Sequence, residues 1–174
     1  MMDRRYPIGQ FHVEVPISEV HTKQWIEEIS QLPEQLTLLV KGLSESELLY
    51  TYREGGWTIK QLIHHIADSH LNSYIRFKLA LTEENPTIKP YEESKWAELW
   101  DYEMPPQSAL DLLAAIHRKW VVLLRSLSAE QLERTFRHPD SGEVNLKENI
   151  GIYAWHGKHH LAHIRLALEN DNKQ

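Results

Sequence analysis

The sequence predicts an all-α protein, a bundle of four long helices joined by shorter ones. Three observations lead to this fold class. Apolar residues recur at three- and four-residue spacing along four long stretches, helix-capping patterns precede several of them, and no run with the two-residue period of a strand competes. With 174 residues, 41% of them hydrophobic and 25% charged, residues 1–174 are expected to fold as a single domain.

The N-terminal segment is expected to end where the first long helix begins, at Ser18. Residues 1–17 are rich in proline and glycine and are expected to form an extended arm. The helix that follows should continue to about Gly42, and Pro33 either kinks it or starts a second piece. Its apolar stripe consists of Val20, Trp25, Ile29, Leu32, Leu36, Leu39 and Val40.

A capping box at residues 58–61 introduces the second long helix. This helix is expected to run to about Leu81, before an Asn-Pro pair ends it. His65 lies at the edge of its inward face, whereas His64 is about 100° away and should point elsewhere. The inward face itself consists of Leu62, Ile66, Ser69 or Ser73, Phe77 and Leu81.

Shorter helices and one long crossover are expected between the long helices. Capping patterns at residues 44–47 and 128–131 each predict a short helix, and residues 138–142 have the composition of a turn. The proline-rich residues 85–107 predict a long crossover between the second and third long helices, with a short helix near residues 92–100.

The third and fourth long helices have clear starting signals. The third begins after Pro106, and the fourth is capped by Asn145 with Glu148 at its third position. The third has the most regular apolar spacing, at Ala109, Leu112, Leu113, Ile116, Trp120, Leu123, Leu124 and Leu127. One broad face of the fourth can present Asn149, Ile152, Tyr153, His156, His160, His163 or Ile164, Ala167 and Leu168.

Charge and composition exclude several functions. A net charge of −6 argues against nucleic-acid binding, which needs a surplus of clustered lysine and arginine. The chain has no cysteine, so disulfides, thiolate metal sites and a cysteine nucleophile are excluded. No apolar run approaches the roughly 18 residues that span a bilayer, and the first residues lack the apolar core of a signal peptide. A cytoplasmic protein without membrane partners is expected.

Histidines supply the clearest chemical signal. His156 and His160 are four residues apart, so on a helix both side chains lie on one face and can point at one metal ion. If the second and fourth long helices face each other, His65 joins them inside the bundle. Three neutral imidazoles leave a divalent ion an open position, where it could lower the pKa of a bound water to about 7 or deprotonate a thiol.

Less specific interpretations stay open beside the metal site. A histidine pair at this spacing can form a solvated polar face, and a metal can simply stabilise two helices in a non-catalytic binding module. Asp68, three residues after His65, could orient an imidazole or pair with a surface cation. His163 is either close to the metal ligands or packed on the helix face, and His70 and His159 are expected at the surface.

The residues around both histidine groups resemble the DinB/YfiT superfamily. The resemblance rests on Gly55-Gly56-Trp57-Thr58, on the stretch from His64 through His70, and on Trp155-His156 through His163. It covers nearly the whole chain and is closest to the YfiT branch of metal-dependent hydrolases. Many relatives end the last motif with Arg-Gly-Gln, where this chain has Leu-Ala-His, so no role for that glutamine transfers.

The resemblance implies a specific architecture and site. It implies a four-helix bundle of up-down-down-up connection, a homodimer, and one divalent ion per subunit, Zn²⁺ first and Ni²⁺ as the alternative. The metal ligands of the family fall on His65, His156 and His160, and no catalytic residue is assigned. The expected function is hydrolysis of a small-molecule substrate, and the alternative is transfer of a low-molecular-weight thiol such as bacillithiol to an electrophile.

Overall fold

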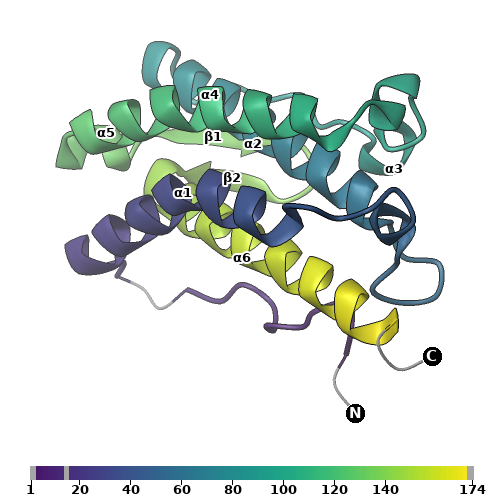
Figure 1. Ribbon diagram of the computed structural model, residues 1–174. Helices are drawn as coiled ribbons and strands as arrows, with labels where there is room; N and C mark the ends of the chain where they lie inside the picture. Colours follow the sequence, from purple (N-terminus) through teal and green to yellow (C-terminus); the bar gives the residue numbers. More distant parts are fainter. Residues whose placement is uncertain (1–2, 14–15, 172–174) are drawn as a thin grey trace.

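The computed structural model describes residues 3–13 and 16–171 and confirms a four-helix bundle (Figure 1). Its long helices are α1 (Glu19–Val40), α2 (Ile59–Thr82), α4 (Pro106–Ser126) and α6 (Leu146–Asp171). The short elements are η1 (Glu47–Leu49), α3 (Glu93–Trp96), η2 (Trp100–Glu103), α5 (Ala129–Leu132), β1 (Thr135–His138) and β2 (Gly142–Asn145). In Figure 1, α1 and α6 run in one direction and α2 and α4 in the other, which is the expected up-down-down-up connection.

The order of the helices around the bundle explains the long crossover. Helix α2 packs against α4 and α6, and α1 packs against the same two helices. Because the neighbours α2 and α4 are parallel, the connection between them must return along the whole bundle, and a helix of 24 residues is about 36 Å long. Residues 83–105, which include α3 and η2, make this return.

Helix α1 is continuous through Pro33. Ser18 caps it, with the side-chain oxygen accepting a hydrogen bond from the His21 backbone N–H at 3.1 Å. A proline inside a helix has no N–H to donate to the carbonyl four residues earlier, which here belongs to Ile29. The buried apolar stripe largely agrees with the expected one, but Val20 is 72% exposed because it lies in the first turn, outside the contact with α4 and α6.

The other expected caps are present. Thr58 and Gln61 form a reciprocal capping box at the start of α2, and Ser128 and Gln131 form another at α5. Asn145 Oδ1 accepts the backbone N–H of Glu148 at 2.8 Å and so caps α6. These local hydrogen bonds fix where α2 and α6 begin and therefore which of their residues face each other.

A two-stranded hairpin was not expected from the sequence. Strands β1 and β2 pair in antiparallel register, with Phe136 opposite Val144, and the expected turn at residues 138–142 joins them. Each strand has four residues and buries only one apolar side chain, which is too short a pattern to stand out in the sequence. The expected short helix near Tyr50 is a single 3₁₀ turn, in which Glu47 accepts the Ser44 N–H.

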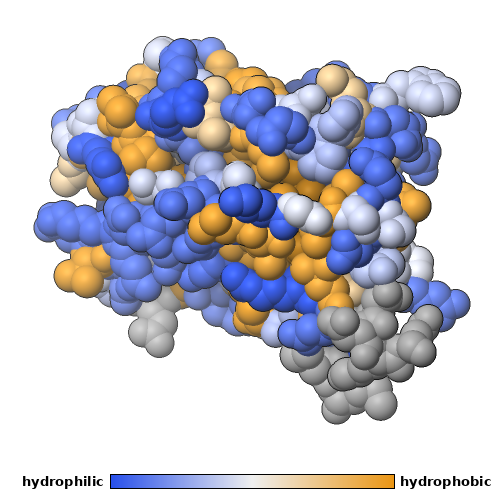
Figure 2. Space-filling model, in the orientation of Figure 1, coloured by the Kyte–Doolittle hydropathy of each residue, from blue (hydrophilic) through white to orange (hydrophobic). Residues whose placement is uncertain are grey.

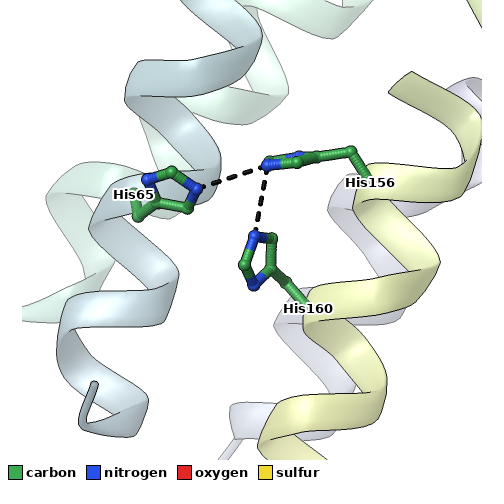
Figure 3. A group of neighbouring side chains, drawn as sticks. All are labelled: His65, His156 and His160. Carbon is green, nitrogen blue, oxygen red and sulfur yellow. Dashed lines mark hydrogen bonds between the residues drawn. The ribbon is translucent and has the colours of Figure 1, made fainter. Parts of the chain in front are cut away.

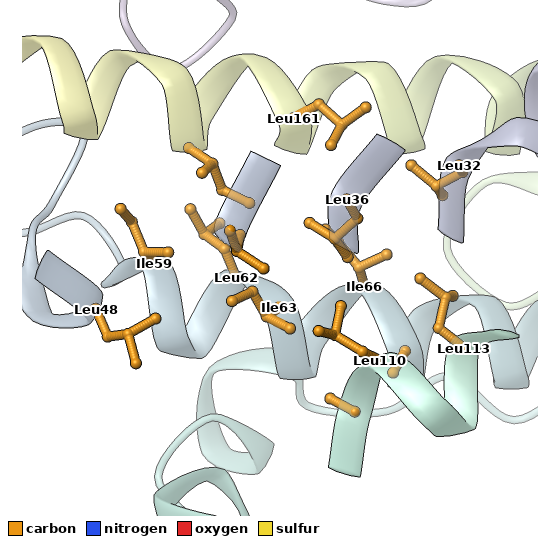
Figure 4. Close-up of a cluster of buried hydrophobic side chains, with 14 of the residues drawn as sticks. Leu32, Leu36, Leu48, Ile59, Leu62, Ile63, Ile66, Leu110, Leu113 and Leu161 are labelled. Atoms are coloured by element: carbon orange, nitrogen blue, oxygen red, sulfur yellow. The ribbon is translucent and has the colours of Figure 1, made fainter. Parts of the chain in front are cut away.

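The apolar core fills the bundle as two clusters. One cluster, drawn in Figure 4, joins all four long helices around Leu36, Leu62 and Leu113. The other surrounds Trp120 and Phe77 toward the hairpin end. Part of the contact between α2 and α6 is polar. There Asn149 Nδ2 donates a hydrogen bond to Ser73 Oγ at 3.1 Å. This polar seam leads along α6 to the histidines.

The N-terminal arm lies along α6 (Figure 1). Trp155 Nε1 donates to the carbonyl of Gly9 at 3.1 Å, and the ring of Phe11 lies against Trp25. Residues 1–2 and 14–15 of the expected arm lie outside the described residues. Among the helices of the described residues, none is long and apolar enough to cross a membrane.

Candidate metal centre

Three imidazole rings from α2 and α6 converge inside the bundle (Figure 3). His65 lies on α2, and His156 and His160 lie one turn apart on α6. His156 Nε2 is 3.3 Å from His65 Nε2 and 3.2 Å from His160 Nε2. One ring nitrogen from each residue lies within 4.8 Å of the other two. The structure therefore brings together all three metal ligands that the sequence predicts.

Burial keeps these rings neutral. His65 is 1% exposed, and burial lowers its pKa to about 4, with a smaller contribution from the charge of His159. Burial also places the pKa of His156 and of His160 well below the usual value, helped by repulsion from the other histidines. Each ring at pH 7 therefore has one N–H and one lone pair, which is the form that binds a metal.

The donor set fits a divalent ion. Two imidazole nitrogens bound to one Zn²⁺ at about 2.0–2.1 Å with tetrahedral angles lie about 3.3 Å apart. The distances from His156 Nε2 to His65 Nε2 and to His160 Nε2, 3.3 and 3.2 Å, agree with that spacing. His65 Nδ1 is buried and has no hydrogen-bond partner among the described residues. The polar contact that orients this ring is therefore the one that its Nε2 atom makes with His156.

Histidines that were expected at the surface are buried. His70 has no exposed surface, because α2 is covered by both α4 and α6 and its buried face is wider than one stripe. His159 is 7% exposed and stacks on Trp155, with ring centroids 4.4 Å apart. His64 points away from the metal ligands as expected, and its Nε2 lies 3.1 Å from the carbonyl of Met104.

Asp68 does not orient a metal ligand. Its carboxylate accepts a hydrogen bond from the hydroxyl of Tyr102 at 2.8 Å, in the crossover. Burial raises the pKa of Asp68, and the Tyr102 hydrogen bond opposes this shift. The side chain thus anchors the crossover to α2, which is neither of its two expected roles.

A second histidine group overlaps the first. His159, His160 and His163 also bring one ring nitrogen each within 4.8 Å. Both nitrogens of His163 have neighbours, since Nδ1 lies 3.3 Å from His160 Nδ1 and Nε2 lies 3.2 Å from the carbonyl of Arg5. The Nε2 atom of His160 faces the first group, so the first group is the better candidate for a metal site.

Comparison with known proteins establishes the family. The DinB superfamily profile matches residues 28–164, more than half of the chain. The chain belongs to the DinB superfamily. A protein from Bacillus cereus strain AH820, named "Putative metal-dependent hydrolase", is 57% identical over 164 residues, 94% of this chain and 95% of that protein.

Two solved structures share the fold. YfiT from Bacillus subtilis, described as a probable metal-dependent hydrolase with an unusual four-helix bundle topology, matches with a TM-score of 0.93 and 43% identity, over 97% of this chain and 98% of that one. The mycothiol-dependent maleylpyruvate isomerase matches with a TM-score of 0.67 and 16% identity, over 82% of this chain and 60% of that one. This second likeness shows a shared fold alone.

Two histidines beside the site, His70 and His117, were missed as possible site residues. His117 interrupts the apolar stripe of α4, between Leu113 and Trp120, and is 2% exposed. A histidine in the middle of an apolar helix face must find a buried polar partner, and this signal was available in the sequence. Its partners could not be read from the sequence because they lie on α1 and α2.

Proposed function

We propose that this DinB superfamily protein is a metal-dependent hydrolase that binds one divalent ion through His65, His156 and His160. The observation that carries the proposal is the convergence of three neutral imidazoles, in which His65 Nε2 and His160 Nε2 lie 3.3 and 3.2 Å from His156 Nε2, the spacing of two ligands on one ion. The names of its relatives support the same activity. Zn²⁺ is the first choice and Ni²⁺ the second, since imidazole ligands suit both ions.

The donor set explains why such an ion would be reactive. When bound by three neutral ligands, a divalent ion keeps its full charge and an open position, and it lowers the pKa of a water or thiol held there. The chain itself holds the ligands in place. Trp57 packs against the ring of His65, with centroids 4.6 Å apart, so the ring of this ligand is supported by an apolar side chain.

The second candidate function is transfer of a low-molecular-weight thiol to an electrophile. The same three ligands would favour a thiolate as readily as a hydroxide. A mycothiol-dependent enzyme shares the fold, which is compatible with this chemistry. In both candidates the partner is a small-molecule substrate, and the cytoplasmic location expected from the sequence stays a prediction.

Metal analysis beside activity assays tests the proposal. The native protein should contain about one divalent ion per subunit, and His65→Ala should lose it, whereas His21→Ala should not, because His21 is exposed on α1. The loaded protein is then incubated with ester and amide substrates, and with an electrophile in the presence or absence of a thiol. Turnover without thiol supports the hydrolase, conjugation only with thiol supports the transferase, and metal-free native protein contradicts both.

We also infer a homodimer formed through the face of α1 and α4. A groove of about 720 Å³ lies between these helices, and Figure 2 looks onto it. Leu38 on α1 is 63% exposed and Val122 on α4 is 71% exposed, and both line the groove. Glu34 and Arg118 supply opposite charges on the two walls, an arrangement that a two-fold axis can pair with itself.

A further inference from the structure

His156 is connected through two other histidines to a backbone carbonyl on α1. Its Nδ1 atom lies 3.1 Å from His70 Nε2. On the other side of that ring, His70 Nδ1 lies 2.9 Å from His117 Nε2. The series ends where His117 Nδ1 lies 2.7 Å from the carbonyl oxygen of Ile29. Three rings and a carbonyl thus form one continuous hydrogen-bond relay from α1 to the metal centre.

The carbonyl at the end decides which nitrogen of every ring carries the proton. A carbonyl oxygen only accepts, so His117 donates through Nδ1 and its Nε2 is an acceptor. His70 must then donate through Nδ1 and accept at Nε2. His156 in turn donates through Nδ1, which leaves its lone pair on Nε2, the atom that faces His65 and His160. The tautomer of His156 is therefore set by a backbone carbonyl at the far end of a relay that passes through His70 and His117.

Pro33 explains why the Ile29 carbonyl is available. In an α-helix this carbonyl would accept the N–H of residue 33, and proline has none. The donor that replaces it comes from α4, as His117 Nδ1–H. A buried carbonyl without a donor is unfavourable, so the pairing of Ile29 with His117 satisfies both groups. The proline inside α1 is thus part of the same arrangement.

A shorter relay acts on His160 in the same way. His163 Nε2 lies 3.2 Å from the carbonyl of Arg5 in the N-terminal arm, so His163 donates through Nε2. Its Nδ1 must accept, and its neighbour at 3.3 Å is His160 Nδ1. His160 then donates through Nδ1 and keeps its lone pair on Nε2. Two independent relays lead to the same tautomer at two ligands.

We propose that His70, His117 and His163 are positioning residues of the metal centre, which hold His156 and His160 with their Nε2 lone pairs directed at the ion. The inference rests on the metal site proposed above. It gives the arm and Pro33 a role in that site, through the Arg5 and Ile29 carbonyls. Hydrogen bonds to the second nitrogen of a metal-ligating histidine typically change metal affinity 10–100-fold.

His65 is expected to behave differently from the other two ligands. Without metal, His156 Nε2 and His160 Nε2 are both acceptors, so the proton between the three rings must come from His65 Nε2. Binding of metal at that atom moves the proton of His65 to Nδ1, which has no partner among the described residues. The tautomer of this ligand alone should change on loading.

Long-range ¹H–¹⁵N correlation spectra of the metal-free protein, labelled at histidine, test the tautomers directly. The proposal expects Nδ1–H for His70, His117, His156 and His160, and Nε2–H for His163 and His65. Addition of Zn²⁺ should change His65 alone to Nδ1–H. An Nε2–H signal for His156 or His160 in the metal-free protein would overturn the proposal, and no variant is needed for this measurement.

Competition with a chelator then measures Zn²⁺ affinity in variants at His70. His70→Leu removes the acceptor for His156 and should weaken binding 10–100-fold, whereas His70→Gln keeps an acceptor near the Nε2 position and should recover most of the affinity. Ser73→Ala is the matched control, because it breaks a buried α2–α6 hydrogen bond outside the relay. Equal losses in all three variants, or no loss in His70→Leu, would contradict a positioning role.

The two measurements separate this inference from the proposed function. If the wild-type protein binds neither Zn²⁺ nor Ni²⁺, the proposed function fails, whatever the spectra show of the tautomers. If Zn²⁺ binds but His156 has the opposite tautomer, the relay fails alone. Should His70→Leu not fold, the spectra of the wild-type protein decide the question.

Discussion

His117 Nδ1 lies 2.7 Å from the carbonyl oxygen of Ile29, across the interface of α4 and α1. This hydrogen bond occupies the place of the intrahelical one that Pro33 cannot make. It shows that the metal centre is not limited to the helices that supply its ligands. All four long helices and the N-terminal arm take part, because the relay runs from the Ile29 carbonyl on α1 through α4 and α2 to α6, and the Arg5 carbonyl of the arm contacts His163 on α6.

Removal of the metal should lower stability measurably. A ligand that binds only the folded state stabilises it by about 2.7 kcal/mol when its concentration is 100 times the dissociation constant. The unfolding temperature should therefore rise with added Zn²⁺ and fall back after chelation, as measured by calorimetry. The His65→Ala variant should show no such rise, and a Zn²⁺-dependent shift of wild-type size in that variant would place the ion elsewhere.

Acid should destabilise the metal-free protein, in part through His117. Burial lowers the pKa of His117 to about 4, and the Ile29 hydrogen bond opposes this shift. Between pH 6.5 and about 4 the unfolded chain binds a proton that the folded chain does not, so stability falls as the pH falls through this window. A pKa shift of this size corresponds to about 3 kcal/mol of unfolding free energy, and this contribution is lost by about pH 4.

Urea unfolding from pH 7 to pH 4.5 measures this dependence. His117→Gln removes one titrating group and keeps a polar side chain. As the pH falls, the unfolding free energy of this variant should therefore decrease by about 1.4 kcal/mol less per pH unit than that of the wild type. Buried histidines that do not contact His117 titrate in both proteins and cancel in the comparison, whereas His70 also loses the repulsion that the His117 charge exerts on it. Parallel curves for the two proteins would show that His117 titrates alike in the folded and unfolded chains.

The close packing of α1 on α6 depends on Gly157, next to the ligand His156. A Cβ atom at this position would lie 2.7 Å from Cδ2 and 3.1 Å from Cδ1 of Leu32, a side chain that is 3% exposed. Gly157→Ala should therefore cost about 1–3 kcal/mol of unfolding free energy, despite the better helix propensity of alanine.

A double-mutant cycle checks that the clash is the cause. Leu32→Ala alone leaves a cavity, and the added methyl group of Gly157→Ala partly fills it. The double variant should be more stable than the sum of the single changes predicts, by at least about 0.5 kcal/mol. Simple additivity, or a Gly157→Ala variant as stable as the wild type, would rule out this contact as the reason for glycine.

The sequence predicted what is encoded locally. Capping boxes and apolar spacing located the four long helices, and the spacing of His156 and His160 predicted that both rings lie on one face of α6. The relays could not be predicted, because His70 and His117 are 47 residues apart and His117 and Ile29 are 88 apart. The expectation that His70 lies at the surface failed because two helices, α4 and α6, cover α2.

Val122→Glu should convert the inferred dimer into a monomer. Val122 is 71% exposed on the wall of the groove between α1 and α4, so a second copy that covers the groove would bury the new carboxylate against apolar side chains such as Leu38. Fully covering a valine side chain contributes about 1.5–3 kcal/mol to association, and the charge adds a desolvation cost.

Analytical ultracentrifugation gives the oligomeric state, and circular dichroism should show unchanged helix content. Val20→Glu is the matched control, because Val20 is 72% exposed on α1 and does not line this groove. A wild-type protein that sediments as a monomer, or equal effects of the two substitutions, would remove this face as the interface.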